Sequence, residues 1–210
     1  MANKTDRSIF VAMLSKAERT KQMIVEQSAQ VFNRKGYSGT SMSDIMEATG
    51  LAKGGIYGNF RDKDELAAAA FDHTYQKVLL AIRARVLAEK TAQCKLLAIF
   101  RFYHNYTVNP DFPGGCPVLN TGVETDDQIP FLKEKAAAAM QEMLQSLQRI
   151  IQKGIDTGEF NTGLDAKLEA ALIYSVIEGG IMMSKLSDQP GILNKLLKHL
   201  KKEVEERFVK

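Results

Sequence analysis

Apolar residues recur at spacings of three and four along almost the whole of this 210-residue chain, and strand-type alternation is absent. A spacing of this kind places the apolar side chains of a segment on one face of a helix. Gly or Pro stands near the ends of the periodic segments, where helices commonly stop. The pattern predicts an all-α protein.

The composition fits such a fold without external stabilisation. Hydrophobic residues make up 45% of the chain, which allows a sizeable core. Cys94 and Cys116 are far apart and match no metal-ligand spacing, so we expect no disulfide, metal or cofactor. No signal-peptide pattern and no run of about 18 apolar residues occurs, so we expect a cytoplasmic protein with no membrane partner.

The periodicity predicts helices at both ends of the chain with little linker between them. The expected helices span about 16–34, 41–50, 52–60, 63–88, 94–106, a short stretch from 117, 130–153, 164–186 and 190–208. Either Thr40 or Ser41 is suited to cap the second helix, and Gly50 is suited to end it. We divide the chain into an N-terminal domain, 1–63, and a larger helical domain, 64–210, joined within the fourth helix.

The basic charge of the chain lies in its N-terminal domain. Residues 1–63 contain ten Lys or Arg and six Asp or Glu, whereas residues 64–210 contain 18 and 19, so their net charges are +4 and −1. This distribution weakly favours a nucleic-acid contact by the first domain, because a similar excess also occurs on ordinary solvated surfaces.

Two short helices with a tight Gly turn between them, after a longer helix, predict a helix-turn-helix that fits a DNA major groove. A helical wheel places Lys53, Gly54 and Tyr57 on one face of the third helix, and Ile56 and Phe60 on the other. The first face combines a cation, a phenol and a glycine that permits close backbone approach.

Residues 40–66, TSMSDIMEATGLAKGGIYGNFRDKDEL, closely resemble the DNA-binding signature of the TetR family of regulators, and the similarity extends over about residues 17–66. By position, the resemblance implies DNA contacts from Thr40, Ser41, Lys53, Gly54, Gly55, Tyr57, Asn59 and Lys63. Asn59 departs from the His or Tyr common there and lies beside the inner face, where it can instead cap the helix end. Taken alone, Lys53 can be a solvated charge and Tyr57 a packed side chain.

The resemblance implies a transcriptional regulator, usually a repressor, whose homodimer binds a palindromic double-stranded operator and is released by a small-molecule effector. An activator is the alternative within that class. A helix-turn-helix protein that binds DNA without sequence preference is the alternative outside it, and a specificity ratio near one would indicate it. We expect no enzyme, because no histidine forms a motif with Cys116.

The last two predicted helices each carry an apolar stripe. One comprises Leu164, Leu168, Ala171, Ser175, Gly179 and Met182, and the other Leu193, Leu197, Leu200, Val204 and Phe208. Such stripes are often ordinary core. The resemblance implies that these helices form a four-helix bundle across a dimer.

Aromatic residues gather in the predicted fifth helix and beyond it, where they can line an effector pocket or simply form core. The candidates are Phe100, Tyr103, His104, Tyr106 and Phe131.

Cys116 precedes Pro117, which suits the first position of a helix, so the thiol is predicted at an N-cap. The helix dipole there favours a thiolate, which predicts a lowered pKa and a sensor of oxidants or electrophiles. The alternative is a buried thiol that fills a packing gap.

Overall fold

The computed structural model describes residues 15–125, 129–189 and 191–209. Within these ranges the regular elements are helices joined by turns and loops, and the one β-type contact is an isolated bridge between Phe160 and Val209. The elements are α2 (Lys16–Lys35), α3 (Met42–Thr49), α4 (Lys53–Tyr57), α5 (Lys63–Leu87), α6 (Ala92–Tyr103), η1 (Tyr106–Val108), α7 (Pro117–Glu124), α8 (Pro130–Asp156), α9 (Ala166–Leu186), α10 (Gly191–Glu203) and η2 (Val204–Phe208). The predicted all-α fold is confirmed. No helix in the described ranges is long and apolar enough to cross a membrane.

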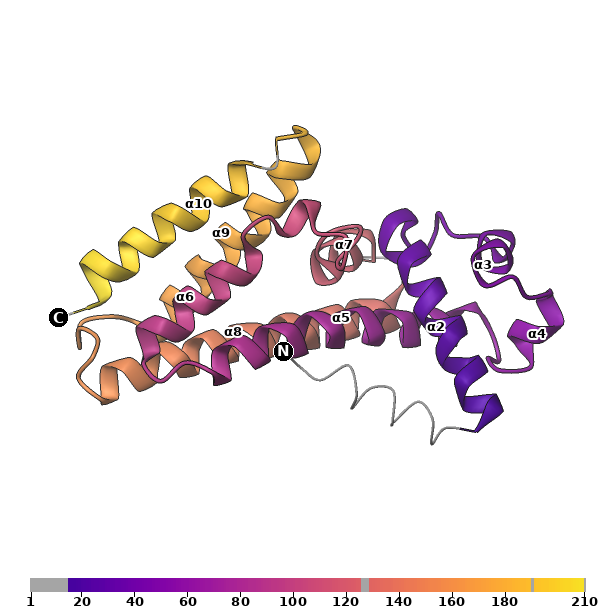
Figure 1. The fold of residues 1–210 in the computed structure, drawn as a ribbon, viewed down its shortest axis with the longest axis horizontal. Coiled ribbons are helices and arrows are strands. Elements are labelled where there is room, and N and C mark those ends of the chain that lie inside the picture. Colours follow the sequence, from indigo (N-terminus) through magenta and orange to yellow (C-terminus); the bar gives the residue numbers. More distant parts are fainter. Residues whose placement is uncertain (1–14, 126–128, 190, 210) are drawn as a thin grey trace.

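Helices α2, α3 and α4 form a small unit, the head, at one end of the elongated molecule (Figure 1). Its core consists of Ile24, Ile45, Ile56, Phe60 and Leu66, none more than 2% exposed. Leu66 belongs to α5, so the head core includes the beginning of this long helix. The prediction that Ile56 and Phe60 face inward is therefore confirmed.

Local capping fixes both ends of α3, the first of the two short helices of the head. Ser41 caps α3: its Oγ accepts a hydrogen bond from the Asp44 amide at 3.1 Å, and Asp44 accepts one from the Ser41 amide at 2.7 Å. Gly50 ends α3 at φ 69°, a left-handed conformation that glycine adopts without a Cβ clash. These two features set the tight turn into α4.

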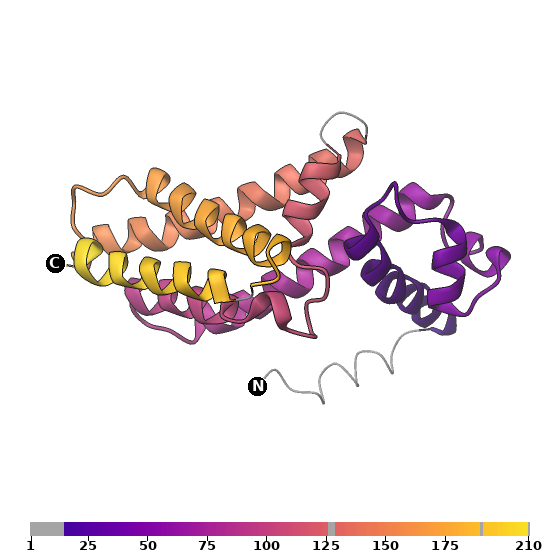
Figure 2. The same ribbon diagram turned by 90° about the horizontal axis from the view of Figure 1, so that it is seen from above.

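The remaining helices form the body, in which α5 packs against α6, α8 against α9, and α9 against α10 (Figures 1 and 2). The body core starts at Phe71 on α5 and continues through every body helix to Phe208. Because α5 also supplies Leu66 to the head core, one continuous helix belongs to both units.

The apolar stripe of the last helix is core of its own protomer. Leu193, Leu197, Leu200, Val204 and Phe208 are at most 6% exposed. They are covered because α10 packs against α9 and α6 of the same chain. The stripe is therefore ordinary core, as the alternative interpretation held, and a contact of α10 with a second copy would use another face of this helix.

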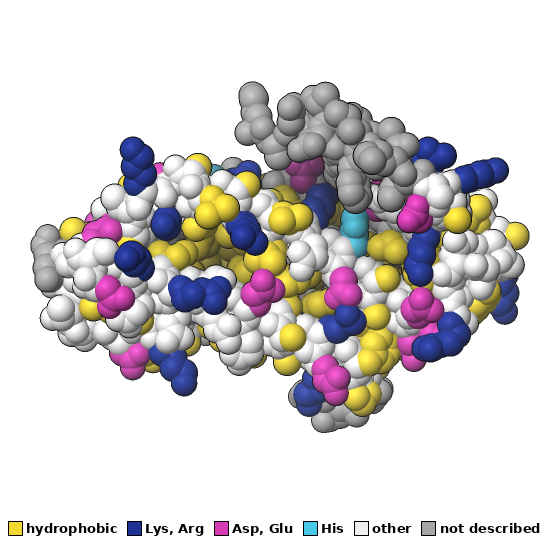
Figure 3. Space-filling model, turned by 90° about the horizontal axis from the view of Figure 1, so that it is seen from below, with side chains coloured by type: hydrophobic (Ala, Val, Ile, Leu, Met, Phe, Trp, Pro, Cys, Tyr) yellow, Lys and Arg dark blue, Asp and Glu magenta, His cyan; other side chains and the backbone are white. Residues whose placement is uncertain are grey.

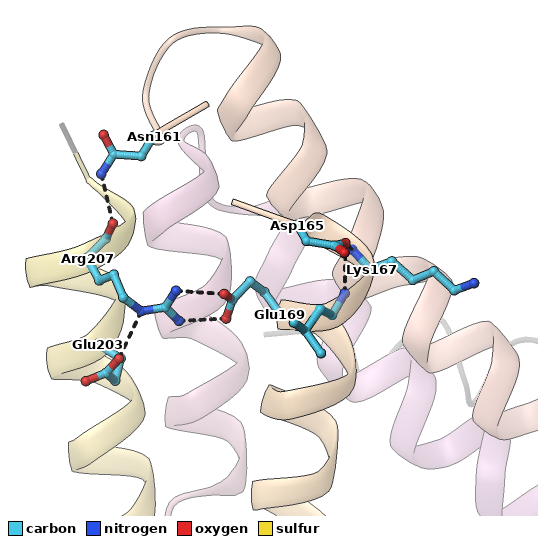
Figure 4. A network of polar contacts seen from close by, with 7 residues as sticks. Asn161, Asp165, Lys167, Glu169, Glu203 and Arg207 are labelled. Carbon is cyan, nitrogen blue, oxygen red and sulfur yellow. Dashed lines mark hydrogen bonds and ion pairs between the residues drawn. The ribbon is translucent and has the colours of Figure 1, made fainter. Parts of the chain in front are cut away.

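The C-terminal end of the body is held by a polar network (Figure 4). The Arg207 guanidinium donates to both carboxylate oxygens of Glu169 on α9 at 2.7 Å, and to Glu203 at 3.1 Å. Asn161 donates its side-chain amide to the Arg207 carbonyl at 2.8 Å. The side chain of Glu169 is only 9% exposed, whereas that of Glu203 is 41% exposed. Glu169 therefore depends on Arg207 to balance its buried charge, whereas the charge of Glu203 is largely solvated.

We predict that Arg207→Met lowers the free energy of unfolding by about 2 kcal/mol, because it leaves the buried Glu169 carboxylate without its bidentate partner. Glu203→Gln is the matched control and should change stability by less than about 0.5 kcal/mol, since an exposed ion pair contributes little. Urea denaturation measures both. Equal losses in the two variants would contradict the assigned role of Glu169.

Candidate nucleic-acid interface and ligand cavity

Helix α4 presents one polar face outward because two apolar residues anchor its other side. Ile56 and Phe60 are 1% and 2% exposed. Lys53, Gly54 and Tyr57 are exposed, and the Lys53 ammonium lies 5.6 Å from the centre of the Tyr57 ring. A Cβ added to Gly54 would meet nothing within 4 Å, so the backbone of α4 is open to a partner there. Gly55 is also exposed on this helix.

The two residues that precede α3 have different positions. Ser41 is exposed at the N-cap, whereas Thr40 is 1% exposed and donates its hydroxyl to the Gly36 carbonyl at 2.5 Å. The predicted contact from Thr40 is therefore corrected: its hydroxyl is used inside the turn between α2 and α3. The Lys35 ammonium and the Ser41 hydrogen bonds hold the pKa of Asp44 well below its usual range.

Lys63 and Asn59 make internal hydrogen bonds beside the α4 face. The Lys63 ammonium donates to the Tyr37 carbonyl at 2.6 Å and lies 4.1 Å from the centre of the Tyr37 ring. Partial burial there lowers the pKa of Lys63. Asn59 donates to the Gly55 carbonyl at 2.9 Å, so it caps the end of α4, as the alternative interpretation held. Tyr37 and its contact with Lys63 had no signal in the sequence.

The head is attached to the body by α7 as well as by α5. The Glu124 carboxylate at the end of α7 accepts hydrogen bonds from the Tyr37 and Ser38 amides at 2.8 and 2.7 Å. Asn120 donates to the Asn33 carbonyl at 3.1 Å. These contacts join residues more than 80 positions apart, so sequence reasoning missed them.

The loop before α7 requires glycine. Gly114 adopts φ +90°, and a Cβ there would lie 2.9 Å from the Asn33 carbonyl oxygen on α2. Asn33 in turn donates to the Pro113 carbonyl at 2.8 Å. The Gly-Gly pair in the sequence was the available signal for this close approach.

Cys116 is the N-cap residue of α7, as the sequence predicted, but its thiol is buried and donates to Glu178 Oε1 at 3.2 Å. Burial and the nearby Glu178 carboxyl raise the pKa of the thiol well above its usual value and outweigh the α7 amides. The predicted lowering of this pKa is therefore wrong. Burial also raises the pKa of Glu178 to about 7.

The body contains a cavity of about 560 Å³ between α5, α6, α8 and α9. Tyr103 lines it, but the other predicted pocket residues do not. His104 is exposed because α6 ends at Tyr103, and Phe131 packs edge-on against Tyr37 near the head. Phe100 is buried in the core, and Tyr106 lines a separate cavity of about 200 Å³. Most of the predicted aromatic residues thus belong to the hydrophobic core, and together they do not form one pocket.

A helix-turn-helix head on a larger helical body is the architecture of a class of DNA-binding regulators. The sequence profile "Bacterial regulatory proteins, tetR family" matches residues 24–70, and "Tetracyclin repressor-like, C-terminal domain" matches residues 92–200. The chain belongs to the TetR family, and it is a helix-turn-helix transcriptional regulator.

Solved and curated relatives agree with this assignment. A TetR transcriptional regulator from Chloroflexus aurantiacus J-10-FL is 35% identical, with a TM-score of 0.89 over 93% of this chain and 99% of the relative. A TetR family regulator from Cytophaga hutchinsonii is 38% identical, with a TM-score of 0.87 over 94% and 98%. The HTH-type transcriptional repressor ComR of Escherichia coli (strain K12) is 27% identical over 176 residues, which are 82% of this chain and 81% of ComR.

The raised pKa of Glu178 makes stability depend on pH. Below the ordinary value of 4.5, folded and unfolded chains are both protonated at this group. Between about pH 4.5 and pH 7 only the folded chain retains the proton, so the free energy of unfolding falls as the pH rises, by up to about 3 kcal/mol, and then levels off. We predict that Glu178→Gln lacks this decline. Urea denaturation from about pH 5 to about pH 8 measures it, and parallel profiles for the two proteins would contradict it.

Proposed function

We propose that this protein acts in the cytoplasm as a homodimeric repressor that binds a palindromic operator and leaves it when a small molecule occupies the cavity of the body. The observation that carries the proposal is the exposed face of α4, where Lys53, Gly54 and Tyr57 stand outward on a helix anchored by Ile56 and Phe60. A cation, a phenol and an uncovered backbone are groups that contact DNA phosphates and base edges.

The other residues implied by the family differ in how directly they contact DNA in this proposal. Ser41 and Gly55 are exposed and contact the DNA backbone directly. Lys63 reaches a phosphate by exchanging its hydrogen bond to the Tyr37 carbonyl. Thr40 and Asn59 act indirectly, since the first holds the turn before α3 and the second caps α4.

A selection of genomic fragments bound by the purified protein tests operator binding, followed by competition against random DNA at stated salt. We expect a palindromic motif, and Lys53→Ala should weaken binding to it at least about ten-fold. Gly54→Ala is the sharper variant. Its added methyl meets open space in the free protein and favours helix, so stability should hold or rise while DNA affinity falls, because the methyl separates α4 from the groove.

Lys195→Ala, on the exposed surface of α10, is the control that should leave binding intact. Fragments recovered without any motif would overturn the repressor proposal in favour of a DNA-binding protein without sequence preference.

The proposed dimer uses the outer face of α9. Its buried residues face the core, while Leu168, Leu172, Met182, Met183 and Leu186 are between 41% and 80% exposed. Ser175 and Gly179 lie in the middle of this stripe, and a Cβ at Gly179 would meet nothing within 4 Å. Small residues flanked by large apolar ones allow two helices to approach closely across a two-fold axis. A contiguous exposed apolar stripe of this kind is typical of an interface.

We predict that Leu172→Glu makes the protein monomeric at micromolar concentration, because it places a charge in the centre of the apolar stripe. Leu80→Glu is the matched control: Leu80 is 59% exposed but belongs to α5. Sedimentation velocity measures both variants. A Leu172→Glu protein that sediments as the wild type, or a monomeric Leu80→Glu protein, would refute the α9 interface.

A further inference from the structure

The main cavity opens on the face of the body formed by α5 and α8. Figure 3 shows this face, with apolar side chains recessed in a hollow and Lys and Arg side chains around it. The cavity of about 560 Å³ lies within the range of sites that enclose a small organic molecule.

The inner wall of the cavity is mainly apolar. Leu79, Ile82 and Val86 line it from α5, Ile99 from α6, and Met143 and Leu147 from α8. An occupant that covers this wall gains by removing apolar surface from water, and a polar body would gain nothing there. The wall therefore selects a ligand with an apolar body.

Five cations line the same cavity: Arg83, Lys90, Lys95, Arg149 and Lys153. They gather there although residues 64–210 carry a net charge of −1. Elsewhere on the body, some cations pair with carboxylates, as Arg101 does with Glu89 at 2.6 Å, and others donate to backbone carbonyls, as Lys185 does to Gly114 at 2.6 Å. Within the described ranges none of the five cavity cations has a carboxylate within ion-pair distance; Arg149 donates to the Ser146 hydroxyl at 3.1 Å. This excess of positive charge is local to the cavity.

The two carboxylates that line the cavity are already engaged by the protein. Glu159 accepts hydrogen bonds from the Ala92 and Gln93 amides, both at 2.8 Å, and so caps α6. Glu142 accepts one from the Tyr75 hydroxyl at 2.8 Å. These bonds fix the two carboxylates in structural positions, and among the described residues neither carboxylate forms an ion pair with a cavity cation.

Three of the cations belong to chain segments at the end of the body remote from the head, where α5 and α8 end and α6 begins (Figure 1). Lys90 lies in the connection between α5 and α6, Lys95 in the first turn of α6, and Lys153 in the last turn of α8. Lys95 is only partly exposed, and it lines the same cavity as Ile99 of the apolar wall, one turn further along α6. The apolar wall and the positively charged end of the cavity are together complementary to a molecule with an apolar body and an anionic group.

We propose that the ligand of this cavity is a small amphipathic anion, whose apolar body lies between α5 and α8 and whose acidic group contacts Lys90, Lys95 and Lys153. The inference rests on the proposed function, since it names the chemical class of the effector. Carboxylate and phosphate share the recognised chemistry, because an ammonium binds either as a point charge.

Isothermal titration with four probes of one chain length tests the charge preference: decanoate, decyl phosphate, decanol and decylamine. We expect the anions to bind the wild-type dimer at least about ten-fold more tightly than decanol, with decylamine weakest, since each exposed cation contributes a factor of about two to five. Tighter binding by one of the two anions identifies the acidic group, and either result supports the proposal.

The matched variants are the triple Lys90→Gln/Lys95→Gln/Lys153→Gln and a control triple on α10, Lys195→Gln/Lys198→Gln/Lys201→Gln, which removes the same charge from a surface outside the cavity. The first should abolish the preference for anions and leave decanol affinity unchanged, and the second should alter neither. Anions and decanol binding alike to the wild type, or a preference that survives the cavity triple, would overturn the proposal.

Release of operator DNA distinguishes this inference from the proposed function. Anion binding that requires the three lysines but leaves the DNA complex intact would support the ligand class and contradict the effector role of the cavity. Release by a neutral or cationic compound that binds the cavity would support the repressor and overturn the anionic ligand.

Discussion

The rest of the structure depends on α5, because this one helix is part of both hydrophobic cores. Leu66 closes the head core, and Phe71, little more than one turn later, begins the body core. A helix packed at both ends transmits a tilt instead of absorbing it, so the direction of α4 follows the position of α5. The same helix supplies Leu79, Ile82 and Val86 to the cavity wall. The residues that orient the exposed face of α4 and those that line the cavity therefore share one rigid element.

A second connection runs from the cavity to the head through α7. Tyr174 lines the cavity and lies one helical turn before Glu178, which holds the Cys116 thiol at the start of α7. At the other end of α7, Glu124 binds the amides of Tyr37 and Ser38 in the turn before α3. Cavity, α7 and head are thus joined by short hydrogen bonds and one eight-residue helix. The buried Glu178 carboxyl costs solvation, and its contact with Cys116 places it at the junction of α7 and α9.

The sequence correctly predicted the features that depend on local spacing, such as which face of a helix is buried. Ile56 and Phe60 set the inner face of α4, which placed Lys53 and Tyr57 outward correctly. The sequence analysis failed where contact with a residue distant in the chain determines the property. The dipole of α7 alone lowers a thiol pKa, but burial and Glu178, 62 residues away, reverse the direction for Cys116.

The stripes of α9 and α10 look alike in sequence, yet α10 is covered by its own protomer while Leu168 and Leu172 of α9 stay exposed. Periodicity reports that a face is apolar and cannot report what covers it.

The contacts between head and body are weak enough to be altered by a small ligand. A coupling of about 1 to 3 kcal/mol between two sites is typical of regulated proteins. A hydrogen bond to a charged group contributes about 1.5 to 3 kcal/mol, so loss of the Glu124 contacts with Tyr37 and Ser38 alone has this magnitude. The cores of head and body are far more costly to disrupt, since each buries several large apolar side chains. In the proposed function, a ligand that shifts α5 or α7 would therefore reorient the head as a unit and leave the folded structure of both parts intact.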